Sequence, residues 1–133
     1  MSQARVDFVL SGYDAMNRGD LEGMFGGLAP EFELIPPGIV PEAEVQHGPE
    51  AAVRFWNRWR ETFDDFHFEI EETIDAGEHV IVMAAVCGKV RGVGAEVRTP
   101  TFPLVWTFEG DRLIRMEALQ NRALALEKVG LAS

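Results

Sequence analysis

A chain of 133 residues has the size of one domain with a single substantial core. Apolar residues make up 47% and charged residues 26% of the chain, an ordinary globular composition, and no apolar run is long enough to cross a membrane. The formal net charge of −10 disfavours nucleic acid as a partner, because contacts to phosphates need clustered Lys and Arg.

The N-terminal residues have the periodicity of two helices joined at a corner. Apolar side chains recur at three- and four-residue steps between 2 and 18, with Ser2 suited to the N-cap, so a first amphipathic helix is predicted there. Gly19 supplies the left-handed residue that ends many helices, and Asp20 caps a short second helix that reaches about Leu28. Helices set at such an angle are expected to line the mouth of a hollow.

A short strand near 32–35 and a third helix follow. The loop between them, 36–47, is rich in proline and acidic residues and is expected to lie over the rim of a pocket. Pro49 opens the helix, because proline at the first helical position sacrifices no hydrogen bond. The helix should end just before Asp64, since carboxylates are unfavourable at the negative C-terminal end of a helix.

From Phe66 onward the hydrophobic period is two, which indicates strands. They are predicted at 66–72, 80–86, 96–108 and 113–122, and the tail from Ala123 is expected to form one or two helical turns. Helices followed by a meander of antiparallel strands form an α+β layout. Glycine and proline within strands bend a sheet, so we expect a sheet curved around the helices with a pocket inside.

Recognisable patterns occur in order along the chain: Tyr13-x-Ala15-x-Asn17-Arg18-Gly19-Asp20-Leu21, His47-Gly48-Pro49-Glu50-Ala51, Ile74-Asp75-Ala76-Gly77-Glu78-His79-Val80, Asp111-Arg112-Leu113-Ile114-Arg115, and the tail from Asn121 to Leu131. Together they resemble the SnoaL-like, polyketide cyclase-related group of the nuclear transport factor 2-like superfamily. The resemblance implies one SnoaL-like domain over residues 1–133. It also implies a cystatin-like roll, in which a cone-shaped antiparallel or mixed sheet wraps around three N-terminal helices. It implies little about activity, because the superfamily hosts isomerases, cyclases, hydrolases, dehydratases and non-enzymatic binders.

The resemblance carries over no catalytic carboxylate. In ketosteroid isomerase a helix tyrosine and two pocket acids act, and their counterparts here are Gly12, Pro36 and Leu104. In limonene-epoxide hydrolase an aspartate of the last strand activates water, and its counterpart is Ala118. Catalytic residues therefore stay unassigned, and the remaining candidates are Tyr13, His47, Arg98 and Glu117.

The resemblance also suggests which strand residues face inward: Ile81, Met83, Ala85 and Cys87, then Phe102, Leu104 and Trp106, then Ile114, Met116, Ala118 and Gln120. The cavity would be mostly apolar, which suits a small hydrophobic molecule. We expect it to be lined by Trp56, Met83, Leu104, Trp106, Met116 and Gln120. A register slip of one residue would turn Gln120 outward and bring Glu117 inside, so the facing of Glu117 stays open.

The candidate site residues have structural alternatives. Tyr13 could donate a hydrogen bond to a ligand, or lie in the core with its hydroxyl at the surface. Trp56 fits an ordinary core helix and could also stack on a flat ligand. A buried Gln120 would need a ligand, a water or another protein group as partner. Arg98 could hold an acidic ligand, or form an ion pair with Glu96 or Glu117.

No metal or other cofactor is expected from the sequence. His47, His67 and His79 have none of the spacings that build zinc or iron sites, and His47, in a rim loop, is a candidate for proton transfer. Cys87 has no sequence signal of an activated thiol and is expected to be a small core residue. As the only cysteine it forms no intrachain disulfide and, with no secretory signal pattern in the first ten residues, this favours the cytoplasm.

Two functions remain open. The first is acid–base chemistry, of isomerase, cyclase or hydrolase type, on a small hydrophobic substrate such as a polyketide, terpenoid or steroid-like compound. The second is a non-catalytic small-ligand-binding or dimeric scaffold domain. An ionisable group at the base of the pocket favours the first, and a pocket with only Gln120 and Tyr13 as polar groups favours the second.

A homodimer through the sheet face is also predicted. Val80, Val82, Ala84 and Val86 alternate with an equally apolar set that is expected to face inward, so both faces of this strand are apolar. An apolar patch of this size favours association with a second copy.

Overall fold

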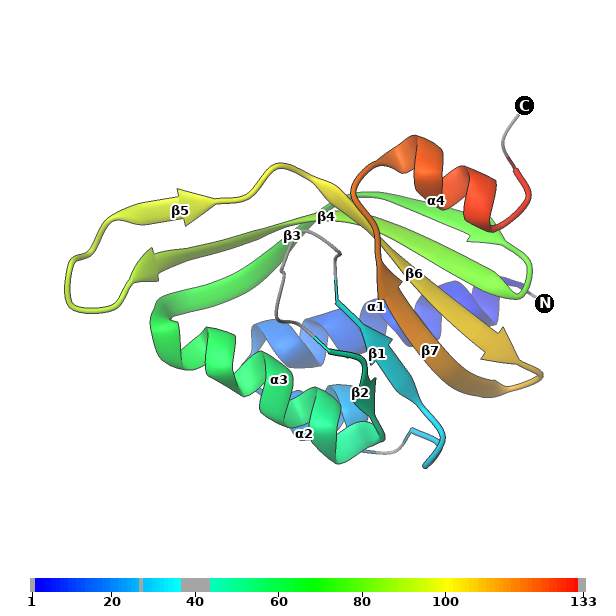
Figure 1. The fold of residues 1–133 in the computed structure, drawn as a ribbon, viewed down its shortest axis with the longest axis horizontal. Coiled ribbons are helices and arrows are strands. Elements are labelled where there is room, and N and C mark those ends of the chain that lie inside the picture. Colours follow the sequence, from blue (N-terminus) through cyan, green and yellow to red (C-terminus); the bar gives the residue numbers. More distant parts are fainter. Residues whose placement is uncertain (1, 27, 37–43, 132–133) are drawn as a thin grey trace.

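The computed structural model describes residues 2–26, 28–36 and 44–131, which form four helices and seven strands (Figure 1). In chain order they are α1 (Ser2–Asn17), α2 (Leu21–Phe25), β1 (Glu33–Ile35), β2 (Gln46–His47), α3 (Pro49–Thr62), β3 (Phe63–Ala76), β4 (His79–Val90), β5 (Glu96–Arg98), β6 (Phe102–Glu109), β7 (Arg112–Ala118) and α4 (Arg122–Lys128). The predicted rim loop 36–47 lies largely outside the described residues. None of the described helices is long and apolar enough to cross a membrane. Placement in the cytoplasm stays a prediction.

The predicted corner between the first two helices is confirmed. Gly19 has a φ of 86°, and the Asp20 side chain accepts a hydrogen bond from the Gly23 amide at 2.9 Å. The end of α1 is tied to the sheet by Asn17, whose side chain donates to the Phe68 carbonyl at 3.1 Å and accepts from the Phe68 amide at 2.8 Å. This amide pairing fixes α1 across β3.

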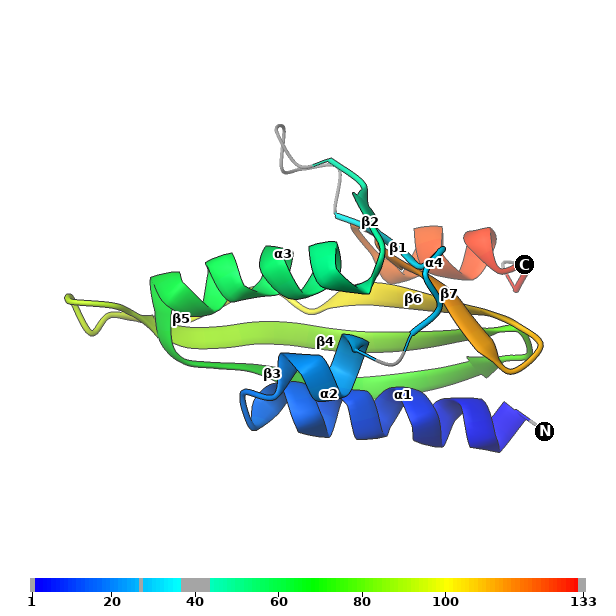
Figure 2. The same cartoon turned by 90° about the horizontal axis from the view of Figure 1, so that it is seen from below.

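The sheet is mixed, with strand order β2-β1-β7-β6-β4-β3 and β5 paired to β4. β1 runs parallel to β7, and the other pairs are antiparallel. The sheet bends around α1, α2 and α3, while α4 lies on its other side (Figures 1 and 2). We call the face toward α1–α3 the inner face and the face toward α4 the outer face. The predicted α+β fold is confirmed.

Two predicted strands have different bounds. The strand predicted at 96–108 is two strands, β5 and β6, because Pro100 lies between them and cannot donate a ladder hydrogen bond. The strand predicted at 113–122 ends at Ala118. Asn121 caps α4 instead, with its side chain accepting from the Leu124 amide at 2.9 Å.

The inward facing predicted for β4 is wrong. Val80 lies opposite Trp106 and Val82 opposite Leu104, and directly opposed residues share a face, so the even-numbered side chains of β4 enter the core. Ile81, Met83, Ala85 and Cys87 therefore face outward. On β7, Met116 and Ala118 face inward as predicted, but a register irregularity places Leu113 in the core in place of Ile114.

Part of the outer face is covered within the chain, by α4. Ile81, Met83 and Val105 form a second apolar cluster with Ala125 of α4. Ion pairs attach α4 at both ends, from Arg122 to Glu72 at 3.1 Å and from Lys128 to Glu117 at 3.1 Å. The residues predicted for an apolar outer patch, Val80, Val82, Ala84 and Val86, face the inner side, and the apolar side chains of the outer face are other ones.

The position of Val82 is testable by substitution. The side chain is fully buried, so Val82→Glu places a charge among apolar groups and is expected to lower the free energy of unfolding by at least about 3 kcal/mol. Val93→Glu, in an exposed turn, should change it by less than about 0.5 kcal/mol. Urea denaturation followed by tryptophan emission measures both. A Val82→Glu variant with an unchanged midpoint contradicts the inner facing of β4.

Candidate functional site

A pocket of about 470 Å³ opens between α3, β1 and the end of the sheet at which β6 begins and β7 ends. Most of its lining is apolar: Leu34, Pro36, Phe55, Trp56, Trp59, Val86, Pro100, Phe102, Met116 and Leu119. The polar side chains are Thr99, Thr101 and Gln120. Contrary to expectation, the corner of α1 and α2 contributes no residue to this lining.

The aromatic wall of the pocket comes from one face of α3. Phe55 and Trp56 pack edge to face with ring centroids 5.1 Å apart, and Trp56 also meets Phe68 of β3 edge to face at 5.3 Å. One turn further along the helix, Trp59 stacks on Phe63 with an interplanar angle of 6°. Because neighbours on α3 and β3 hold the Trp56 ring, its plane is set before any ligand enters.

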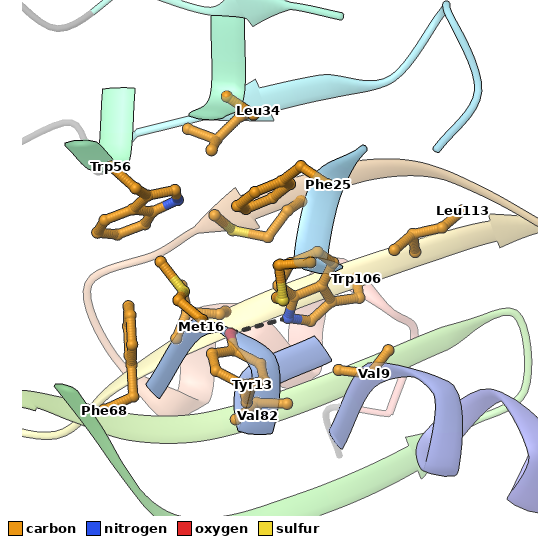
Figure 3. Packing of buried hydrophobic residues seen from close by; sticks show 14 of the residues in the cluster. Val9, Tyr13, Met16, Phe25, Leu34, Trp56, Phe68, Val82, Trp106 and Leu113 are labelled. Carbon is orange, nitrogen blue, oxygen red and sulfur yellow. Dashed lines mark hydrogen bonds between the residues drawn. The ribbon is translucent and has the colours of Figure 1, made fainter. Parts of the chain in front are cut away.

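The indole N–H of Trp56 is the unusual polar group of this wall. The nitrogen is buried, and it has no hydrogen-bond partner among the described residues. Figure 3 shows it on the ring edge that faces Leu34 and Phe25. A buried donor without a partner costs roughly 1–3 kcal/mol. An acceptor atom that reached this edge would recover that free energy.

The threonines of the lining are engaged within the protein. The Thr99 hydroxyl accepts a hydrogen bond from the Val86 amide at 2.9 Å, and the Thr101 hydroxyl donates to the Glu71 carboxylate. The hydrogen bonds from Thr101 and then Arg98 lower the pKa of Glu71, so this carboxylate stays ionised and paired. No ionisable side chain is among the described residues that line the pocket.

The structure brings together only part of the predicted pocket. Trp56, Met116 and Gln120 line one cavity, with Gln120 placed beyond the end of β7 and exposed at the mouth. Leu104 and Trp106 are buried in the core and do not reach the cavity. Met83 lies on the outer face, because the odd-numbered side chains of β4 point away from α1–α3.

Glu117 faces outward. It lies opposite Val105, whose side chain belongs to the outer cluster, and it pairs with Lys128. The register that would have brought a carboxylate into the pocket from β7 is therefore excluded.

Tyr13 lies in the core, as its second alternative predicted, but its hydroxyl is buried and not at the surface. The phenol oxygen accepts a hydrogen bond from the Trp106 indole at 3.0 Å, and the residue is 1% exposed (Figure 3). Burial raises the pKa of the Tyr13 phenol far above its ordinary value of about 10. The hydroxyl therefore stays neutral and serves the core, where it satisfies a buried indole N–H.

The other candidates lie outside the pocket lining. His47 on β2 is exposed, with its Nδ1 3.6 Å from a Glu33 carboxylate oxygen. Arg98 forms ion pairs, as one alternative predicted, but its partners are Glu69 and Glu71, each at 3.1 Å on the outer face. Sequence spacing could not identify these partners, because they follow from the strand register.

Cys87 is buried, as predicted, but on the outer side of the sheet. Burial raises the pKa of its thiol, and the Glu69 carboxylate adds to this shift. The thiol is therefore mainly protonated near neutral pH in the absence of a bound cation.

Sequence reasoning missed several lining residues, among them Phe55, Trp59 and Thr99, whereas Phe102, expected to face inward, does line the pocket. Two signals pointed to them. Trp59 follows Trp56 by three residues and so shares its helix face. Pro100 interrupts a strand pattern, and such a break turns the flanking residues away from the ladder.

The sequence profile of the SnoaL-like domain family matches residues 9–116. The chain belongs to the SnoaL-like domain family. The resemblance seen in the sequence motifs is thus confirmed, and the cavity beside α3 is referred to below as the SnoaL-like pocket. Among proteins of curated function, no significant match is found.

Solved structures share the fold of this SnoaL-like chain at low sequence identity. An NTF2-like protein from Burkholderia thailandensis is 23% identical, with a TM-score of 0.75, over 93% of this chain and 95% of that one. TerC, co-crystallised with polyporic acid, is 20% identical with a TM-score of 0.72 over 93% and 95%. A protein with a ketosteroid isomerase-like fold from Catenulispora acidiphila, in complex with trimethylamine, is 15% identical with a TM-score of 0.71 over 92% of each chain. Such identities show the fold alone.

Tyr13 is the only tyrosine of the chain, which makes its ionisation a direct test of the core. The folded state holds the phenol proton more tightly than the unfolded state does. The contribution of the Tyr13 phenol to the free energy of unfolding is therefore fully present below about pH 10 and is lost as the pH rises above that value. The near-ultraviolet absorbance of tyrosinate should therefore appear together with the loss of far-ultraviolet circular dichroism. Ionisation near pH 10 with the circular dichroism unchanged shows that the hydroxyl is accessible.

Proposed function

We propose that the SnoaL-like pocket, within one domain over residues 1–133, binds a small, flat, largely apolar molecule that carries a hydrogen-bond acceptor, without acid–base catalysis. The observation that carries this proposal is the unpartnered Trp56 N–H beside an apolar cavity whose described lining contains no ionisable group. The volume of about 470 Å³ lies within the range of small-molecule sites. The ligand complexes of TerC and of the Catenulispora protein support small-molecule binding by this fold.

Acid–base chemistry of isomerase, cyclase or hydrolase type is the second candidate. It needs a titratable group within hydrogen-bond reach of the reacting atom. Glu71 is a carboxylate that the Thr101 hydroxyl connects to the pocket, and the hydrogen bond to Thr101 together with the ion pair to Arg98 keeps it from acting as a free base. The geometry therefore favours the binding function.

The proposal is tested with two flat probes, 9-fluorenone and fluorene, which share a ring system and differ in one carbonyl oxygen. If Trp56 donates to the ligand, fluorenone should bind about 5- to 10-fold more tightly, the equivalent of one hydrogen bond of about 1 kcal/mol. The preference should vanish in Trp56→Phe, which keeps the aromatic ring and loses the donor. Quenching of tryptophan emission during titration measures each dissociation constant.

Two further variants distinguish the effect of the Trp56 hydrogen-bond donor from the effect of the cavity itself. Trp59→Phe, in the same wall, should leave the preference for the ketone intact. Met116→Trp should fill the pocket and abolish binding of both probes, at a cost of about 1–3 kcal/mol in stability if the side chain is overpacked. Failure of either probe to bind the unmodified protein, or conversion of a bound probe, overturns the proposal.

We also propose a homodimer through the outer sheet face, although not through the valines first considered. Its support is apolar exposure on the C-terminal segment, where Leu124 is 42% and Leu131 49% exposed. Sedimentation velocity at micromolar concentration should give a dimer, and Leu124→Glu should shift it toward a monomer while Val93→Glu should not. A monomeric unmodified protein contradicts this proposal.

A further inference from the structure

A second hollow, also of about 470 Å³, lies on the outer face where β3, β4 and β5 pair, and it shares no lining residue with the SnoaL-like pocket. His67 and Glu69 are two residues apart on β3, and Cys87 lies directly opposite His67 on β4. Side chains two apart on a strand, and directly opposed on paired strands, share a face. The register therefore brings together an imidazole, a carboxylate and a thiol that the sequence leaves apart.

The spacing of these groups suits one small cation. One ligand atom from each of the three side chains lies within 4.8 Å of the others. His67 Nε2 is 3.4 Å from Glu69 Oε2. Two ligands of a tetrahedral zinc ion, each bound at about 2.0–2.2 Å, lie about 3.4 Å apart.

The hydrogen bonds of His67 and Glu69 leave one atom of each free to bind a cation, and the Cys87 thiol lies beside the same Glu69 carboxylate. His67 Nδ1 is 2.6 Å from the carbonyl oxygen of Asp65, and because a carbonyl only accepts, Nδ1 carries the proton. Glu69 Oε1 accepts from the Arg98 Nε at 3.1 Å. In a neutral imidazole this leaves the Nε2 lone pair facing the lone pairs of Glu69 Oε2. A proton or a metal ion between these two acceptors would turn their repulsion into attraction.

We propose that His67, Glu69 and Cys87 bind a Zn²⁺ ion on the outer face, with the fourth coordination position open to water in the hollow. Imidazole nitrogen, thiolate sulfur and carboxylate oxygen are the donors that zinc takes. On binding, the thiol proton passes to solvent and a zinc–sulfur bond forms. Arg98 remains compatible with the ion because Glu71 pairs with its guanidinium at 3.1 Å. The site is independent of the proposed ligand function.

Cobalt(II) is the probe that tests this site, because it reports the sulfur ligand spectroscopically. Titration of metal-free, reduced protein with Co²⁺ should give thiolate-to-cobalt charge-transfer absorption in the near ultraviolet, and one equivalent of Zn²⁺ should remove it. Cys87→Ser should lose this band. His67→Gln should weaken Zn²⁺ binding, measured by competition with a chromophoric chelator, by at least about tenfold.

The matched control is His47→Gln, since His47 also lies beside a glutamate, Glu33, at 3.6 Å, but its described neighbourhood holds no cysteine. It should leave Zn²⁺ affinity unchanged. Far-ultraviolet circular dichroism verifies the fold of each variant. In the unmodified protein, bound Zn²⁺ should protect Cys87 from alkylation, and this measurement tests the site without any variant. The absence of a charge-transfer band and of protection, or equal Zn²⁺ affinity in His67→Gln, overturns the proposal and leaves His67 and Glu69 as an ordinary ion pair.

Discussion

The pairing of β4 with β3 and β6 determines what the rest of the molecule can do. The side chains of β4 from Val80 to Ala85 are all buried, although they point alternately to the two faces of the sheet. Even-numbered ones meet β6 side chains and the helices on the inner face, whereas Ile81 and Met83 meet Val105 and α4 on the outer face. A slip of one residue would exchange the two sets. The inner pocket and the outer ligand cluster both follow from this single register.

Local signals in the sequence predicted the elements, but not the facing of the central strand. The corner after α1 depends on Gly19 and the Asp20 cap, which are neighbours in sequence, and the turn at Gly77 is equally local. Most of the facing of β6 and β7, although not that of Ile114, could be predicted, because polar residues such as Thr107 and Glu117 alternate with the buried ones. In β4 the run 80–85 is apolar on both faces, so alternation carries no information about which side meets the helices.

The candidate site divides in the same way between local and long-range information. The helix face that carries Trp56 and the strand face that carries Met116 follow from periodicity, and both line the pocket. The mouth depends on where β7 ends and on how the chain leaves the sheet at Pro100, and strand alternation predicts neither. The contact of His67 with Cys87 depends on a pairing register that includes an irregularity between Asp64 and His67. No spacing rule in the sequence could have revealed it.

The two buried indole groups differ in whether the protein itself satisfies their N–H donors. Trp106 is packed on all sides, and its N–H is satisfied by Tyr13 at 3.0 Å, so the core holds no unpaired donor there. Trp56 has the same donor, equally withdrawn from solvent, but no acceptor among the described residues. An unsatisfied donor costs roughly 1–3 kcal/mol, a substantial share of the 5–15 kcal/mol that stabilises an ordinary domain. At Trp106 the protein removes this cost itself, through Tyr13. Under the proposed binding function, an acceptor atom of the ligand would remove it at Trp56, and the free energy lost in the empty protein would contribute to binding.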